Sequence, residues 1–252
     1  MNSPLGILVP MQEEVELLVS MVEQPEMMQW SSRSFYKGFL NGKRVVVAQS
    51  GIGKVASSFT ASLLIQHFRV GAILVTGVAG GISDHIHVGD LAIATQAVQH
   101  DMDCFPLFPK YMIPHSGITF YEPDTKLTET LNKAASSFLQ YEFQQVVSED
   151  MLSALGIHKP TIHSGLLVSG DQFIGTENQL NEIQKGLPDS LFVEMEGAAV
   201  AQVCHDAGVP WCSIRTISDK ANAKAHLDFN LFLNQAGKIY TSAVARKFVE
   251  ML

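Results

Sequence analysis

Short, wholly apolar segments that alternate with segments of helical period are the feature that most constrains this chain. Residues 72–76 (AILVT) show no polar alternation, which is typical of a strand buried on both faces. Further strand patterns lie at 6–10, 35–40, 44–49, 90–99, 165–168, 191–193 and 211–217. Helical periods cover about 13–22, a segment from Val55 onward with Phe59 and Leu63 at four-residue spacing, 126–139, 198–205 and 231–249. This order predicts a three-layer α/β/α fold with a mixed, mostly parallel central sheet.

Length and composition limit the possible classes of protein. The 252 residues are 46% hydrophobic, which is enough for a sizeable core, and no repeat or linker divides them. We therefore expect one domain over residues 1–252. The formal net charge of −8 argues against binding to nucleic acid or to an anionic membrane. Three cysteines without CxxC spacing, short apolar runs and no secretory signal lead us to expect a cytoplasmic protein.

Acidic side chains follow the predicted strands at the points where those strands end. They are Glu14, Asp171, Glu194, Glu196 and Asp219. Open α/β sheets bind ligands at the carboxyl ends of their strands. We therefore expect a single site that gathers these carboxylates.

Two of the acidic positions also have a purely structural interpretation. Glu14, with Glu13 before it, stands in the first turn of a helix, where negative charge complements the helix dipole without any function. Strand alternation puts Glu194 and Glu196 on one side of their strand and Met195 on the other. Glu196 could cap the next helix, or it could accept hydrogen bonds from a sugar diol.

The last predicted strand carries a basic residue and ends in an acid. A buried arginine normally has a carboxylate partner, so Arg215 is expected to pair with Glu196 or Glu14. Ser218 could orient the carboxyl group of Asp219. This arrangement favours an acid–base site over a structural ion pair.

A glycine-rich segment and several histidines suggest other ligands less strongly. Residues 51–56 (GIGKVA) fit the loose dinucleotide pattern, but residues 71–76 lack the acid that would hold a ribose. A glycine-lined wall against a small ligand is the preferred interpretation. The pair His85 and His87 and the segment 100–103 (HDMD) lack a recognisable metal spacing. We expect no metal and no cofactor.

Six segments in order carry a resemblance to a known family: 11–14 (MQEE), 50–54 (SGIGK), 76–81 (TGVAGG), 169–173 (SGDQF), 193–196 (VEME) and 215–219 (RTISD). Over residues 5–250 the chain closely resembles the bacterial methylthioadenosine/S-adenosylhomocysteine nucleosidases of the nucleoside phosphorylase superfamily. The resemblance implies a nucleoside phosphorylase-like fold. It also implies that the chain releases adenine from 5′-methylthioadenosine, S-adenosylhomocysteine and related nucleosides.

The resemblance implies a catalytic role for several residues. Glu14 matches the glutamate that activates water, and Asp219 matches the acid that protonates adenine N7. Arg215 matches an arginine near the nucleophilic water. Glu196 and the backbone of Met195 match the groups that bind the ribose hydroxyls.

The resemblance also implies which residues form the pocket walls. Phe173 matches an aromatic side chain stacked on adenine, and the backbone of Ile174 matches the edge that reads the base. Ile52 and Phe229 match walls around the ribose and its 5′-substituent. Family members are homodimers in which a neighbour's loop closes the 5′ pocket, and Pro114 is the nearest match to that loop.

The chain departs from the family pattern in places that affect the 5′-group. Val78 stands where some members carry serine, which removes a polar contact. Residues 104–115 align poorly, and residues 147–161 resemble an insertion. The preference among methylthio, homocysteinyl, deoxy and futalosine-like substituents therefore stays open.

The residue chemistry favours hydrolysis of a 6-aminopurine nucleoside. Asp219 suits the exocyclic amino group, whereas a 6-oxopurine would be better served by an amide. Loss of the base leaves positive charge on the sugar, which carboxylates stabilise. A phosphorylase needs clustered arginines for phosphate, and residues 10–14 (PMQEE) contain none. The alternatives are a phosphorylase of the same superfamily and a nucleoside-binding protein without activity.

Overall fold

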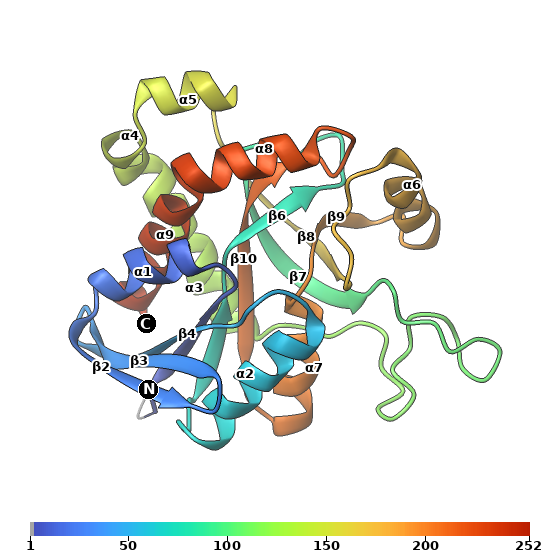
Figure 1. Cartoon of the computed structure of the whole chain (residues 1–252), viewed down its shortest axis with the longest axis horizontal. Helices are drawn as coiled ribbons and strands as arrows, with labels where there is room; N and C mark the ends of the chain where they lie inside the picture. Colours follow the sequence, from blue (N-terminus) through green and yellow to red (C-terminus); the bar gives the residue numbers. More distant parts are fainter. Residues whose placement is uncertain (1–2) are drawn as a thin grey trace.

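The computed structural model describes residues 3–252, apart from the side chains at 234 and 235 (Figure 1). Its strands are β1 (Leu5–Val9), β2 (Glu23–Trp30), β3 (Arg33–Leu40), β4 (Lys43–Gln49), β5 (Ala72–Val75), β6 (Val78–Gly81), β7 (Leu91–Gln99), β8 (Ile162–Ser169), β9 (Ser190–Glu194) and β10 (Trp211–Asp219). Its α-helices are α1 (Gln12–Ser20), α2 (Lys54–Gln66), α3 (Thr125–Ser137), α4 (Phe143–Val146), α5 (Glu149–Leu155), α6 (Glu177–Gly186), α7 (Gly197–Ala207), α8 (Ala225–Phe232) and α9 (Lys238–Met251). Two π-helical segments, η1 (Phe138–Glu142) and η2 (Leu233–Gly237), continue α3 and α8.

The strands form one mixed sheet in the order β2-β3-β4-β1-β5-β10-β6-β9-β8-β7. Strand β10 belongs to both halves of this sheet. Its first residues pair in parallel with β5, and its last residues pair in parallel with β6. Its middle residues pair antiparallel with β7, so strands β6 to β10 close on themselves. The carboxyl end of β10 is thereby held among several strand ends.

Helices cover both faces of the sheet. Alternate residues of each strand point into the hydrophobic core on one face or into the core on the other. In β1, Ile7 and Val9 pack in a cluster with residues of α1, α3 and α9, whereas Leu8 packs in a cluster with residues of α2 and α7. Side chains of a strand point alternately to its two faces, which gives this division. The expected three-layer arrangement of a mixed sheet between helices is confirmed (Figure 1).

Helix α2 buries a different face from the one its apolar spacing suggested. Val55 and Phe59 are 82% and 41% exposed. The buried face instead carries small residues and the helix's later aliphatic side chains: Ser57, Thr60, Ala61, Leu64 and Ile65. Small side chains let α2 lie close against α7, whose buried residues include three alanines and a glycine.

Several elements escaped the sequence patterns. Strand β2 is an exposed edge strand without apolar alternation, and α5 has no buried residue. The expected closing helix is divided into α8, η2 and α9. By contrast, the expected turn between β3 and β4 is confirmed, since Asn41 and Gly42 both have positive φ.

Among residues 3–252, none of the helices combines the length and the apolar character needed to cross a membrane.

Candidate active site

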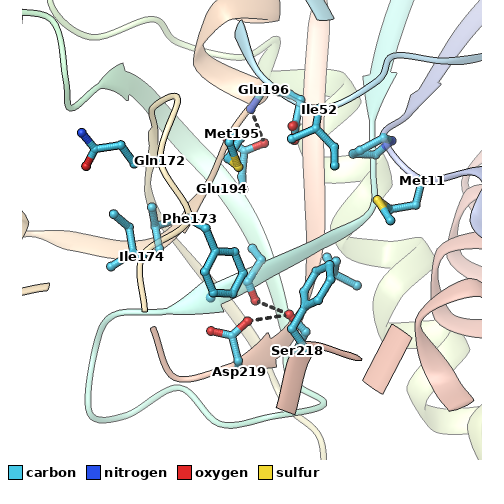
Figure 2. A pocket seen from close by; sticks show the side chains of 16 residues that line it. Met11, Ile52, Gln172, Phe173, Ile174, Glu194, Met195, Glu196, Ser218 and Asp219 are labelled. Carbon is cyan, nitrogen blue, oxygen red and sulfur yellow. Dashed lines mark hydrogen bonds between the residues drawn. The ribbon is translucent and has the colours of Figure 1, made fainter. Parts of the chain in front are cut away.

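A cavity of about 370 Å³ lies where β1, β8, β9 and β10 end (Figure 2). Its wall is largely apolar, and its charged groups are all acidic. The lining residues are Pro10, Met11, Ile52, Val78, Ala79, Gly80, Gln172, Phe173, Ile174, Val193, Glu194, Met195, Glu196, Ser218, Asp219 and Phe229. Segments distant in the sequence thus meet around one small space, as expected for the carboxyl ends of the strands.

Nine of the residues expected in the site line this cavity: Ile52, Val78, Phe173, Ile174, Met195, Glu196, Ser218, Asp219 and Phe229. Phe173 and Phe229 meet edge to face, with their ring centroids 5.8 Å apart. Glu14 and Arg215 are fully buried and lie outside the lining. Pro114 is also outside it, in the long segment between β7 and α3 that projects from the body (Figure 1).

Asp219 ends β10 with its carboxyl group almost completely buried. Its Oδ1 accepts a hydrogen bond of 2.8 Å from the backbone N–H of Ala221, and its Oδ2 lies 2.8 Å from Ser218 Oγ. Burial raises the pKa of Asp219. A Cβ at Gly80 would lie only 3.0 Å from Asp219 Oδ1, so β6 needs a glycine beside this carboxyl group.

The hydroxyl of Ser218 lies between two oxygens and has one proton to give. It is 3.2 Å from the carbonyl oxygen of Ala79 and 2.8 Å from Asp219 Oδ2. When Ser218 donates to Ala79, the proton between Ser218 and Asp219 has to come from the carboxyl group. The geometry therefore accommodates a neutral, protonated Asp219.

Glu14 is held in the first turn of α1 by a residue of the last helix. Its Oε1 accepts a hydrogen bond of 2.8 Å from Thr241 Oγ1, whereas its buried Oε2 has no hydrogen-bond partner among the described residues. Burial raises the pKa of Glu14 to about 7, against the opposing effects of Thr241 and of the positive charge of Arg215. The role of Thr241 could not be predicted from the sequence, because one hydroxyl in a helix leaves no recognisable pattern.

Arg215 lies fully buried in the middle of β10. Its Nη1 donates a hydrogen bond of 3.1 Å to the carbonyl oxygen of Thr76. Its Nη2 forms an ion pair with Glu194 and lies 3.4 Å from Glu196 Oε2. The expected partner was Glu196 or Glu14; the pairing with Glu196 is confirmed, and Glu194 is a second, closer partner that the sequence did not suggest. Glu194 ends β9, which is separated from β10 only by the short strand β6, and its carboxyl group contacts the guanidinium of Arg215 directly.

The two glutamates at or just after the end of β9, Glu194 and Glu196, have separate tasks. Glu194 accepts hydrogen bonds from the backbone N–H groups of Glu196 and Gly197, at 2.9–3.1 Å, and from Ser169 Oγ. It therefore caps α7, whereas the side chain of Glu196, at the N-cap position, makes no capping bond. Glu196 Oε1 instead accepts from the Gly53 N–H at 3.0 Å. Burial and the nearby charge of Glu194 raise the pKa of Glu196.

The histidines do not assemble a metal site in the part of the chain that the structure describes. No group of three or more His, Cys, Asp or Glu side chains there could hold a metal ion. His85 and His87 are exposed in the loop after β6.

The arrangement can both give and take a proton at the same pH. Asp219 is a buried carboxyl group whose raised pKa favours the acid form. Glu14 has a pKa near neutrality and an unpaired oxygen. A third carboxyl group, that of Glu196, lines the cavity together with Asp219. Paired carboxyl groups of this kind are suited to cleaving glycosidic bonds.

Comparisons with known proteins agree with this chemistry. The family model described as the phosphorylase superfamily matches residues 4–250. A curated 5′-methylthioadenosine/S-adenosylhomocysteine nucleosidase of Staphylococcus aureus is 35% identical over 233 residues, covering 92% of this chain and 93% of the relative. The nucleosidase of the same name from Neisseria meningitidis, solved with methylthio-immucillin-A, is 31% identical with a TM-score of 0.88, over 99% of this chain and all of its own. Helicobacter pylori futalosine hydrolase is 32% identical with a TM-score of 0.84, over 99% and 98% of the two chains.

Proposed function

The chain belongs to the 5′-methylthioadenosine/S-adenosylhomocysteine nucleosidases of the phosphorylase superfamily, and we propose that Glu14, Glu196 and Asp219 carry out its reaction. That reaction is hydrolysis of the N-glycosidic bond of 5′-methylthioadenosine and S-adenosylhomocysteine, which releases adenine. The observation that carries the proposal is that two buried carboxyl groups, Glu196 and Asp219, line one cavity, and that the buried Glu14 stands in the helix that follows the lining residue Met11.

Each carboxyl group has a different task in the proposed mechanism. Asp219, whose acid form is favoured by burial, gives its proton to N7 of adenine, so that the base leaves as a neutral molecule. Glu14 takes a proton from water, which attacks the anomeric carbon as the bond to the base breaks. Glu196 accepts hydrogen bonds from the ribose hydroxyls and stabilises the positive charge on the sugar. Arg215 holds the charge of Glu196 in place and lowers the pKa of Glu14.

The apolar wall fits the remaining parts of the nucleoside. We assign the adenine ring to Phe173 and the backbone of Ile174, with Ser218 orienting the acid below it. The backbone of Met195 joins Glu196 at the ribose. Ile52, Val78 and Phe229 enclose the sugar and its 5′-substituent. The mechanism requires no cofactor.

Hydrolysis is favoured over phosphorolysis by the charge of the site. Of the described residues that line the cavity, none is lysine or arginine, and three are acidic. Arg215 is already engaged by two glutamates. Phosphate would therefore meet repulsion from carboxylates where it must attack.

An adenine-release assay tests the function directly. Purified protein is given 5′-methylthioadenosine, S-adenosylhomocysteine, 5′-deoxyadenosine and aminodeoxyfutalosine, each with and without inorganic phosphate. We expect adenine from the first two at rates that do not depend on phosphate. The futalosine arm determines whether the chain shares the activity of its futalosine hydrolase relative. Strict phosphate dependence would support the phosphorylase, and binding without adenine release would support the inactive binding protein.

We further propose a cytoplasmic homodimer formed by one 252-residue domain per subunit. Exposed apolar side chains on and before α2 (Ile52, Val55 and Phe59) offer a surface for a second copy. In such a dimer the projecting segment with Pro114 would close the 5′ end of the neighbour's cavity.

A further inference from the structure

Three polar residues from distant segments form a closed ring beside the cavity. Lys54 Nζ forms an ion pair of 2.6 Å with Asp101 Oδ1. Asp101 Oδ2 accepts a hydrogen bond of 2.9 Å from the backbone N–H of Asp171. Asp171 Oδ1 in turn accepts a hydrogen bond of 2.8 Å from the backbone N–H of Lys54. The ring therefore joins the start of α2, the end of β7 and the loop after β8.

The ring is a well-defined part of the structure rather than a loose surface pair. The side chains of Lys54 and Asp101 are only 16% and 20% exposed. Lys54 Nζ also lies 3.2 Å from Gln99 Oε1, and Gln99 donates to Gln202 of α7. Burial opposes ionisation of Asp101, but the hydrogen bonds from Lys54 and from the Asp171 backbone outweigh it and lower the pKa of Asp101. Exposed ion pairs contribute little, whereas partly buried, multiply bonded ones hold geometry.

The ring lies next to the group that would bind the ribose. Gly53 directly precedes Lys54, and its N–H points at Glu196 Oε1 at 3.0 Å. Gly53 has φ of +95°, and a Cβ there would lie 3.0 Å from Asp171 Oδ1. The backbone that presents this N–H is thus held directly against Asp171. The other end of the ring fixes the loop that carries Gln172 and Phe173 into the cavity.

We propose that Asp101 and Lys54 are positioning residues that, through Asp171, hold the Gly53 N–H on Glu196 and so align this carboxylate with the sugar diol. The inference rests on the proposed role of Glu196 in binding the ribose hydroxyls. Neither residue contacts the reacting atoms, because both lie outside the cavity lining. Their effect on catalysis should therefore depend on whether the substrate carries the two hydroxyls that Glu196 binds.

The test compares two substrates in the same variants. Asp101→Asn keeps the shape of the side chain but removes its charge, and Lys54→Met removes the ammonium group. With 5′-methylthioadenosine, we expect kcat/KM to fall by about 10-fold to 100-fold, the range for misplaced catalytic geometry. With 5′-methylthio-2′,3′-dideoxyadenosine, which lacks both hydroxyls of the diol, we expect the same variants to differ from the unmodified protein by less than about threefold. Lys54→Arg should restore most of the activity on the ribonucleoside.

Controls separate positioning from general damage. Glu26→Gln breaks an exposed ion pair with Lys37 in the distant edge strands of the sheet. It should leave kcat/KM unchanged with both substrates. The double variant Asp101→Asn/Lys54→Met should lose no more than either single variant, because both changes break one ring. Thermal unfolding verifies that each variant is folded.

Three results would overturn the inference: equal losses on the two substrates, no loss on the ribonucleoside, or additive losses in the double variant. Failure of the unmodified protein to release adenine would instead count against the proposed function. The two failures are therefore distinguishable.

Discussion

Glu14, the proposed base, is expected to favour catalysis and to lower stability at neutral and higher pH. Burial raises its pKa from 4.5 to about 7, so its folded form prefers the proton. Its contribution to stability is fully present below pH 4.5 and is lost as the pH rises through 7. Glu14→Gln should therefore abolish adenine release and yet raise the free energy of unfolding at pH 8 by roughly 3 kcal/mol. Activity assays and urea unfolding at pH 4.5 and pH 8 measure both effects.

The opposite behaviour is expected of Glu194, which serves the structure. Glu194→Ala leaves the buried guanidinium of Arg215 without its principal partner and removes the cap of α7. Loss of one partner from a buried pair costs about 3–5 kcal/mol. Glu196→Gln, which keeps the shape of a side chain with fewer contacts, should lower kcat/KM while leaving the melting temperature nearly unchanged. Equal destabilisation by the two substitutions would show that their tasks are not separate.

At the scale of elements, the sequence predicted the buried strands and the acidic residues at their ends. The apolar run of β5 and the polar ends of β9 and β10 located the sheet and the acids of the site, because burial on both faces leaves a continuous pattern. Strand β2 escaped, since an exposed edge strand carries no such pattern. Partners that meet only in space, such as Thr241 with Glu14 or Asp101 with Lys54, leave no local pattern and required the structure.

At this scale, the exposed face of α2 leads to a prediction about the proposed dimer. Its apolar spacing suggested a core face, yet Val55 and Phe59 point to solvent in the isolated chain. If this face joins two copies, Phe59→Glu should place a charge in an apolar interface and shift the protein to monomers in analytical ultracentrifugation. Thr125→Glu on α3, at an exposed position, adds the same single negative charge and serves as the matched control. A monomeric unmodified protein would contradict the proposed dimer.

At the scale of the whole molecule, the fold brings the proposed acid and the proposed base together from distant parts of the chain. Glu14 stands near the start of the sequence and Asp219 near its end. The closure of β10 with β6 and β7, and the packing of α1 against α9, hold both beside one cavity. The central claim is that Asp219 acts as the general acid and Glu14 as the general base. Either residue alone would leave one of the two proton transfers without a catalytic group.

A change of leaving group tests that division most directly. The 5-methylthioribosyl derivative of p-nitrophenol carries a leaving group that needs no protonation, so general acid catalysis is dispensable with it. Release of p-nitrophenol is followed with Asp219→Asn, Glu14→Gln and the unmodified protein, beside adenine release from 5′-methylthioadenosine. The account predicts that Asp219→Asn loses adenine release but keeps most of its activity on the nitrophenyl substrate, whereas Glu14→Gln loses both. Equal loss of both activities in Asp219→Asn would contradict its role as the acid.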